Sequence, residues 1–214
     1  MRFRSLVSLV CVCMVLGARG QQDWRLKKDQ EGIRIYSRRA GGSPFDDIRV
    51  ETILTGRLTA LAAALLDIGN YPRWSFHCEK AYVLRRVTPS ELYFYSLIRS
   101  PWPASDRDLA VHLRLHQDTV THVLYVDADE VAGYIPAKKG IVRVPKSLER
   151  WKVTPLPGGQ MSVSYFLQLD PGADAPSWLI NAFSTSGPYE TFSHLREQLR
   201  EPIYRDATPP FIRN

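Results

Sequence analysis

The histidines of the segment LAVHLRLHQ are the first side chains whose types and spacing suggest chemistry. His112 and His116 are four residues apart, and on a helix this spacing would place both imidazoles on one face as metal ligands. The strict alternation of apolar and polar residues indicates a strand instead, in which the two rings lie roughly 13 Å apart along the chain. We therefore predict two histidines in solvent or at the rim of a sheet, and no metal site.

His77 and Cys78 are adjacent in the segment FHCEK, and their types match those of a general base and a nucleophile. Neighbouring side chains of an extended segment point to opposite sides, which separates this imidazole from this thiol. The sequence also lacks a Gly-x-Ser-x-Gly motif, a glycine-rich phosphate loop and metal-ligand spacing. We therefore predict no catalytic residue and no cofactor.

His122 is the remaining candidate for a polar group inside the fold. If a hairpin turn occupies residues 117–120, His122 lies opposite Leu115, and Leu124 lies opposite Leu113. This register puts the His122 ring on the apolar face of the strand. There it is either a core histidine with one hydrogen-bond partner or a contact to a ligand.

The first twenty residues have the pattern of a cleaved secretory signal. Basic residues precede an apolar stretch over residues 6–16, and small residues precede Gln21. This stretch is shorter than the roughly 18 apolar residues that span a membrane as a helix. We expect export, to the periplasm or out of the cell, and a mature chain of residues 21–214. Lipid attachment at Cys11 or Cys13 is the alternative interpretation of this segment.

The mature chain has the composition of one soluble domain without disulfides. The full sequence has 28 Lys and Arg against 22 Asp and Glu, and removal of Arg2, Arg4 and Arg19 leaves 25 basic residues and a net charge of +3. Such a mild charge does not indicate nucleic-acid binding. Cys78 is the cysteine that remains, so an internal disulfide is impossible and the core alone must hold the fold. We expect one domain and a monomer.

The apolar periodicity predicts an α+β fold with an antiparallel sheet, because consecutive strands lie between helices at the two ends of the chain. The segment DWRLKKDQ is typical of a short amphipathic helix, and Gly187-Pro188 should kink or divide the last helix. A turn at residues 41–44 joins the first two strands. The expected helices are 23–30, 57–68 and a long one that begins near Asp174 and Pro176, and the expected strands are 33–39, 47–56, about 80–88, 91–100, 107–117, 120–128, 141–153 and 160–169.

The strand at residues 160–169 has one apolar face, on which Met161, Val163 and Tyr165 alternate with polar neighbours. A strongly curved sheet with such a face, covered by one long helix, can fill its interior or leave it open for a ligand. The alternation alone does not separate these two arrangements, since an apolar and aromatic face is ordinarily core.

Four segments, in this order, resemble the START domains, which are lipid-transfer domains related to the steroidogenic acute regulatory protein. They are LLDIGNYPRW at 65–74, PWPASDRD at 101–108, the hairpin at 149–172 and the segment at 175–199. The resemblance covers roughly residues 22–203 and departs from the family at PGADAPSW, where the family is often richer in glycine. It implies a helix-grip fold, in which a curved antiparallel sheet wraps around a long C-terminal helix and encloses an apolar tunnel.

The charged corner before the strand at residues 107–117 is best explained as architecture. The prolines of Pro-Trp-Pro fix a bend that cannot pair in a ladder, and we expect Trp102 to shield the end of the core. Asp106, Arg107 and Asp108 offer compact partners to one another and to nearby backbone. Arg107 is also our candidate for a cation that meets a ligand headgroup at the end of the tunnel.

The resemblance implies binding, with transfer in addition, of a lipid or other small hydrophobic molecule. The alternatives are a cyclase or aromatase-like enzyme of the same superfamily and an exported ligand sensor without transfer. The moving parts would be the helix around residues 179–192 and the loop at 130–140. Lys138, Lys139, Arg143 and Lys146 either favour transient contact with an anionic membrane or belong to a solvated loop. The candidate ligand-binding residues are Arg107, Leu113, His122, Leu124, Met161, Val163, Tyr165, Leu179, Phe183 and Phe192.

Overall fold

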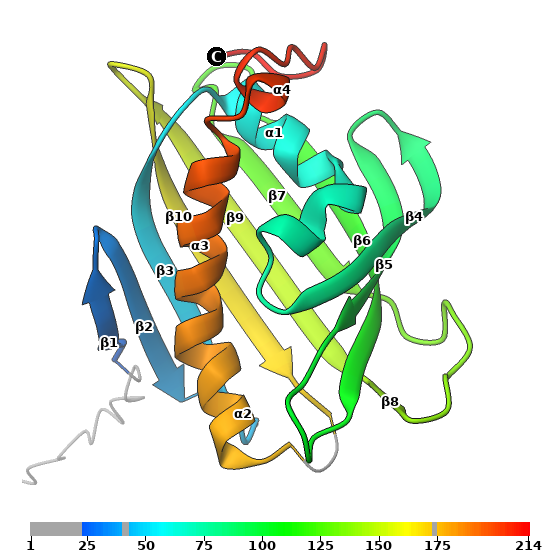
Figure 1. Ribbon diagram of the computed structural model, residues 1–214. Coiled ribbons are helices and arrows are strands. Elements are labelled where there is room, and N and C mark those ends of the chain that lie inside the picture. The colour runs from blue at the N-terminus through cyan, green and yellow to red at the C-terminus, as the bar shows by residue number, and fades with distance from the viewer. Residues whose placement is uncertain (1–22, 40–42, 173–174) are drawn as a thin grey trace, which may run out of the picture.

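The computed structural model describes residues 23–39, 43–172 and 175–214, and it contains a curved antiparallel sheet wrapped around a C-terminal helix (Figure 1). The expected signal segment, Gly41 and Gly42 of the expected turn, and Asp174 lie outside the described residues. The strands are β1 Arg25–Gln30, β2 Ile33–Arg39, β3 Asp46–Thr55, β4 Cys78–Thr88, β5 Glu91–Ile98, β6 Asp106–Gln117, β7 Leu124–Glu130, β8 Ile141–Arg143, β9 Lys146–Leu156 and β10 Gln160–Asp170.

The strand order is β1-β2-β3-β10-β9-β7-β6-β5-β4, and β8 pairs with β6 in parallel. β3 and β10 bring the two halves of the chain together, with Val163 opposite Thr52. This order closes the sheet around its concave face, and the predicted helix-grip fold is confirmed.

Six helical segments cover the concave face and one end of the sheet in the described part of the chain. They are α1 Leu58–Leu66, the 3-10 helix η1 Ile68–Arg73, α2 Ser177–Asn181, the π-helical turn η2 Ala182–Ser186, α3 Gly187–Gln198 and α4 Pro202–Arg205. α3 lies along the concave face and α1 packs beside it (Figure 1). Among the described residues, no helix has both the length and the apolar character needed to cross a membrane.

The division expected at Gly187-Pro188 is confirmed, because α3 begins at Gly187 after the π-helical turn. Proline has no backbone N–H, so Pro188 cannot continue the ladder of the preceding segment and fits best in a first helical turn. The inner face of α3 then buries Phe192, Leu195 and Leu199 against the sheet and α1.

The helix predicted at residues 23–30 is wrong, since Arg25–Gln30 form the edge strand β1. Its side chains are mostly exposed, so no apolar face was available to hold a helix on the core. Pairing with β2, interrupted by a bulge between Leu26 and Lys28, satisfies its backbone instead. The strand predicted at 141–153 is divided at Val144 and Pro145, and only its second part, β9, joins β10.

The register predicted for β6 and β7 is also wrong. Leu115 pairs with Val126 and Leu113 with Ala128, so Leu124 lies opposite Gln117. The cause is a longer turn, in which the Asp118 carboxylate accepts hydrogen bonds from the N–H groups of Val120 and Thr121 at 3.0 and 2.6 Å. Aspartate commonly stabilises turns in this way.

His122 lies in this turn with a left-handed backbone (φ 56°) and a partly exposed side chain. It therefore does not lie on the apolar face where the sequence analysis placed it.

Candidate ligand-binding cavity

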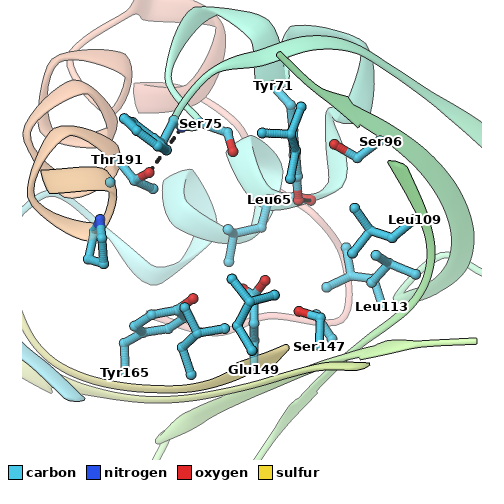
Figure 2. Close-up of a pocket in the computed structure, with 18 of the residues that line it drawn as sticks. Leu65, Tyr71, Ser75, Ser96, Leu109, Leu113, Ser147, Glu149, Tyr165 and Thr191 are labelled. Atoms are coloured by element: carbon cyan, nitrogen blue, oxygen red, sulfur yellow. Dashed lines mark hydrogen bonds between the residues drawn. The ribbon is translucent and has the colours of Figure 1, made fainter. Parts of the chain in front are cut away.

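A cavity of about 150 Å³ lies between the concave face of the sheet, η1 and the start of α3 (Figure 2). Its walls are mainly apolar and aromatic. The alternation of β6 turns Leu109, Val111 and Leu113 toward it, and Trp151, Tyr165 and Phe192 pack against one another with ring centroids 4.9 to 5.4 Å apart. An engineered apolar cavity of about 150 Å³ takes up benzene. The hollow thus holds about one ring, and a larger ligand requires movement of its wall.

The polar groups of the wall come from η1, β5, β9, β10 and α3. Ser96, Ser147 and Thr191 contribute hydroxyl groups. The Tyr71 hydroxyl donates to the Leu65 carbonyl at 2.7 Å. Burial raises the pKa of Tyr71 and of Tyr165 well above the ordinary value, so both phenols are neutral.

Glu149 is the charged side chain among the described residues that line the cavity. Burial raises the pKa of its carboxyl group to about 7. Hydrogen bonds from Tyr165 and Trp151 and the nearby Arg150 charge act in the opposite direction, and burial prevails. The partial exposure of Glu149 matches its position on the wall of the hollow. Figure 2 shows its carboxyl group directed away from the sheet, toward Leu65.

The structure brings four of the ten candidate ligand-binding residues to the cavity wall. These are Leu113, Tyr165, Phe183 and Phe192. Met161 and Val163 share a face of β10 with Tyr165 but are fully buried in the closed part of the core, as is Leu124. Leu179 is buried at α2 outside the wall, and His122 lies in the β6–β7 turn.

Arg107 also lies outside the cavity wall. Its side chain is 1% exposed and donates to the Ser105 carbonyl and, at 3.4 Å, to the Ser100 hydroxyl. Burial lowers its pKa, and its Nε has no hydrogen-bond partner within the described residues. Arg107 therefore holds the β5–β6 corner and does not face the cavity.

The rest of the charged corner is built as predicted, except for its tryptophan. The Asp106 carboxylate accepts the Ser100 N–H at 2.8 Å, and Asp108 accepts Arg143 Nε at 2.6 Å. Trp102 is 92% exposed, so the expectation that it shields the core is wrong. The rigid Pro-Trp-Pro bend turns this ring outward instead.

Two of the four basic residues considered for membrane contact are engaged by the protein. Arg143 binds Asp108 and the carbonyls of Ile135 and Pro136, and Lys138 lies 3.7 Å from the centre of the Tyr95 ring. These contacts fix the loop at residues 130–140 to the outer face of the sheet. Lys139 and Lys146 are exposed.

The histidines of β6 lie on the outer face of the sheet. His112 contacts Glu91 at 2.7 Å and stacks on Tyr93, whereas His116 stacks on Tyr125. Within the described ranges, no three His, Cys, Asp or Glu side chains are grouped as metal ligands would be. Burial raises the pKa of the Cys78 thiol, which disfavours the nucleophilic thiolate.

The sequence analysis missed Glu149, Trp151, Tyr71 and Trp74, which also line the cavity. For Glu149 a signal existed. In SLERWKV the face that carries Ser147, Trp151 and Val153 is buried, and Glu149 is the acidic residue on that face. The aromatic residues of η1 had no periodic signal, because a 3-10 turn is too short to show one.

The sheet, the helix that it grips and the hollow between them define a helix-grip domain with an internal apolar cavity. The sequence matches the START domain profile over residues 8–203. It is 31% identical over 194 residues to an uncharacterized protein of Pseudomonas aeruginosa, which covers 90% of this chain and 95% of that one. It is 26% identical to the phosphatidylcholine transfer protein of Mus musculus, over 77% of this chain and 78% of that one.

Solved structures agree with this family. A STAR-related lipid transfer protein fragment from Xanthomonas axonopodis has a TM-score of 0.76 and 31% identity, and the match covers 83% of this chain and 99% of that chain. The human StAR-related lipid transfer protein 5 shares the fold, with a TM-score of 0.72 at 17% identity, over 85% and 88% of the two chains. The chain belongs to the START domain family, whose named relatives here are lipid-transfer proteins and not enzymes.

Proposed function

We propose that the cavity binds the apolar part of one lipid or similar small hydrophobic molecule, and that the protein carries this molecule between membranes. The observation that carries the proposal is the hollow itself, which is enclosed by apolar and aromatic walls between the sheet and α3. Burial of each methylene group gains about 0.8 kcal/mol against water. Against a bilayer the gain is close to zero, because the chain moves between two apolar phases. Such a balance suits a carrier that must both load and release.

Loading of a long-chain lipid requires the wall to open, since about 150 Å³ is too small for one. Phe183 in η2 supports an opening at the helix, because it lines both the cavity and an outer groove of about 660 Å³. Leu167 and Leu169 also line both spaces. We therefore place the gate at η2 and the start of α3, where the π-helical turn interrupts the regular helix.

We place the membrane-docking surface at the end of the sheet where this gate lies. Trp102 in the β5–β6 loop is 92% exposed and Trp178 in α2 is 42% exposed. Figure 1 shows that loop and α2 at the same end of the molecule. Tryptophan partitions to the interface between water and lipid, so two exposed rings beside a gate favour docking there.

Transfer of a fluorescent phospholipid between vesicles tests the proposal. The protein should accelerate transfer, and Trp102→Ala should weaken both transfer and vesicle binding while the melting temperature is kept. Val120→Ala is the matched control, because Val120 is 85% exposed in the β6–β7 turn, away from the gate. Ligand uptake without any acceleration of transfer would replace the carrier by a protein that only binds, such as a sensor.

We also propose that the protein acts after export, on the basis of the signal pattern at residues 1–20. N-terminal sequencing of the protein from a secreting host should begin at Gln21. An intact N-terminus on protein retained in the cytoplasm would contradict this location.

A further inference from the structure

Glu149 is a carboxyl group in an apolar hollow that offers it no cation within the described wall. Ser147, Glu149 and Trp151 alternate toward the cavity, whereas Arg150 points to the outer face and pairs with Asp127 and Asp129 at 3.1 and 2.6 Å. The nearest guanidinium group is therefore committed to two other carboxylates on the far side of the sheet.

The polar neighbours of Glu149 are hydrogen-bond donors on two strands. Tyr165 of β10 and the Trp151 indole of β9 hydrogen-bond to its carboxyl group, and both bonds favour the ionised form. Across the cavity, Tyr71 donates its hydroxyl proton to Leu65, and burial keeps this phenol neutral. The pocket thus stabilises a carboxylate by two neutral donors and leaves its charge uncompensated.

We propose that Glu149 selects ligands by charge, so that the cavity takes an amphiphile with an amine-type cation at its buried polar end and rejects one with an anion there. An unpaired buried charge is costly, and a ligand cation would compensate it in surroundings of low dielectric. The faces of Trp151, Tyr165 and Phe192 also attract cations. This inference rests on the proposed function, because it assumes that the cavity holds a ligand.

The affinity for charged ligands should then depend on pH in opposite directions. With a pKa of about 7, the ionised fraction of Glu149 rises from about 3% at pH 5.5 to about 97% at pH 8.5. A ligand cation that requires the carboxylate should bind up to about thirtyfold more tightly at pH 8.5. An anionic ligand should bind more weakly there, and a neutral one should not change. On the outer strands Arg150 and Asp129 keep their charges over this range.

Three probes with the same eight-carbon chain test the inference: octylammonium, octyl sulfate and 1-octanol. Their dissociation constants would be measured by calorimetry at pH 5.5 and 8.5 for the natural chain, Glu149→Gln and Glu130→Gln. Glu130 is the matched control, because it is a partly buried glutamate on β7 that does not line the cavity. It also separates Glu149 from His77, which stacks on the wall residue Phe76 and has an imidazole that can titrate in this range.

We expect Glu149→Gln to abolish the preference for octylammonium over octyl sulfate at pH 8.5, and Glu130→Gln to retain it. Equal binding of all three probes at both pH values by the natural chain would overturn the charge selection and leave the proposed function intact. That result does not depend on whether the variant folds. Failure of 1-octanol to bind at either pH would instead overturn the proposed function, and this inference with it.

Discussion

Replacement of Glu149 by glutamine should change how the stability of the protein depends on pH. The carboxyl group ordinarily titrates at 4.5, and in the folded protein its pKa is about 7. Between these values the native state keeps a proton that the unfolded state has released, so the free energy of unfolding falls as the pH rises. The stability tied to this group is fully present below pH 4.5 and is lost by about pH 8.

The magnitude follows from the size of the shift. A rise of roughly 2.5 pKa units corresponds to about 3 kcal/mol, since one unit is worth about 1.4 kcal/mol. Water inside the cavity would hydrate the carboxylate and reduce this value, so about 3 kcal/mol is the upper limit. Glutamine keeps the shape of the side chain and has no titrating proton, so the variant should lack this loss.

Urea denaturation at several pH values between 4.5 and 8.5 measures the effect. The difference in unfolding free energy between Glu149→Gln and the natural chain should grow by about 3 kcal/mol in favour of the variant across this range. Glu201→Gln, at an exposed position before α4, controls for the loss of one negative charge. Parallel curves for the natural chain and Glu149→Gln, within about 0.5 kcal/mol, would refute a buried carboxyl group in the cavity.

Three further substitutions test the cavity and its frame. Ala128→Phe places a ring in the hollow of about 150 Å³ and should weaken 1-octanol binding in calorimetry by tenfold or more; unchanged uptake would place the ligand elsewhere. Asp108→Asn leaves Arg143 without its carboxylate and should cost about 3 kcal/mol in urea denaturation, whereas a neutral result would mean that the pair adds no net stability. Gly172→Ala should lower the melting temperature, because Gly172 has φ +87° and a Cβ there would lie 2.7 Å from Val142 Cγ1; an unchanged melting curve would contradict this packing.

The sheet could be predicted from the sequence where one face of a strand is buried. β6 and β10 alternate over their full length, so their inward residues, such as Leu113 and Tyr165, followed from a period of two. The edge strand β1 has no buried face, and its pairing with β2 overrode a weak helical pattern. Periodicity therefore identifies a strand only where the core selects its side chains.

The cavity was harder to predict than the sheet, because two neighbouring positions on one face can line a hollow or fill a core. Tyr165 lines the cavity and Val163 is packed in the core, although both alternate inward on β10. The difference depends on which helix lies opposite, and a strand pattern contains no such information. Glu149 was visible as an acidic residue on a buried face, whereas His122 was misplaced by the longer turn that Asp118 stabilises.

Native mass spectrometry of the mature protein, purified without detergent from an exporting host, tests most directly whether the interior holds a hydrophobic ligand. The account predicts a reproducible adduct with the mass of a lipid, or uptake of one from a mixed lipid extract, and a much smaller signal for Ala128→Phe. Because Ala128 lines the cavity, that variant links the adduct to the hollow. Bare protein that takes up nothing from the extract would contradict the account and would leave a non-lipid cargo or an enzyme as the alternatives.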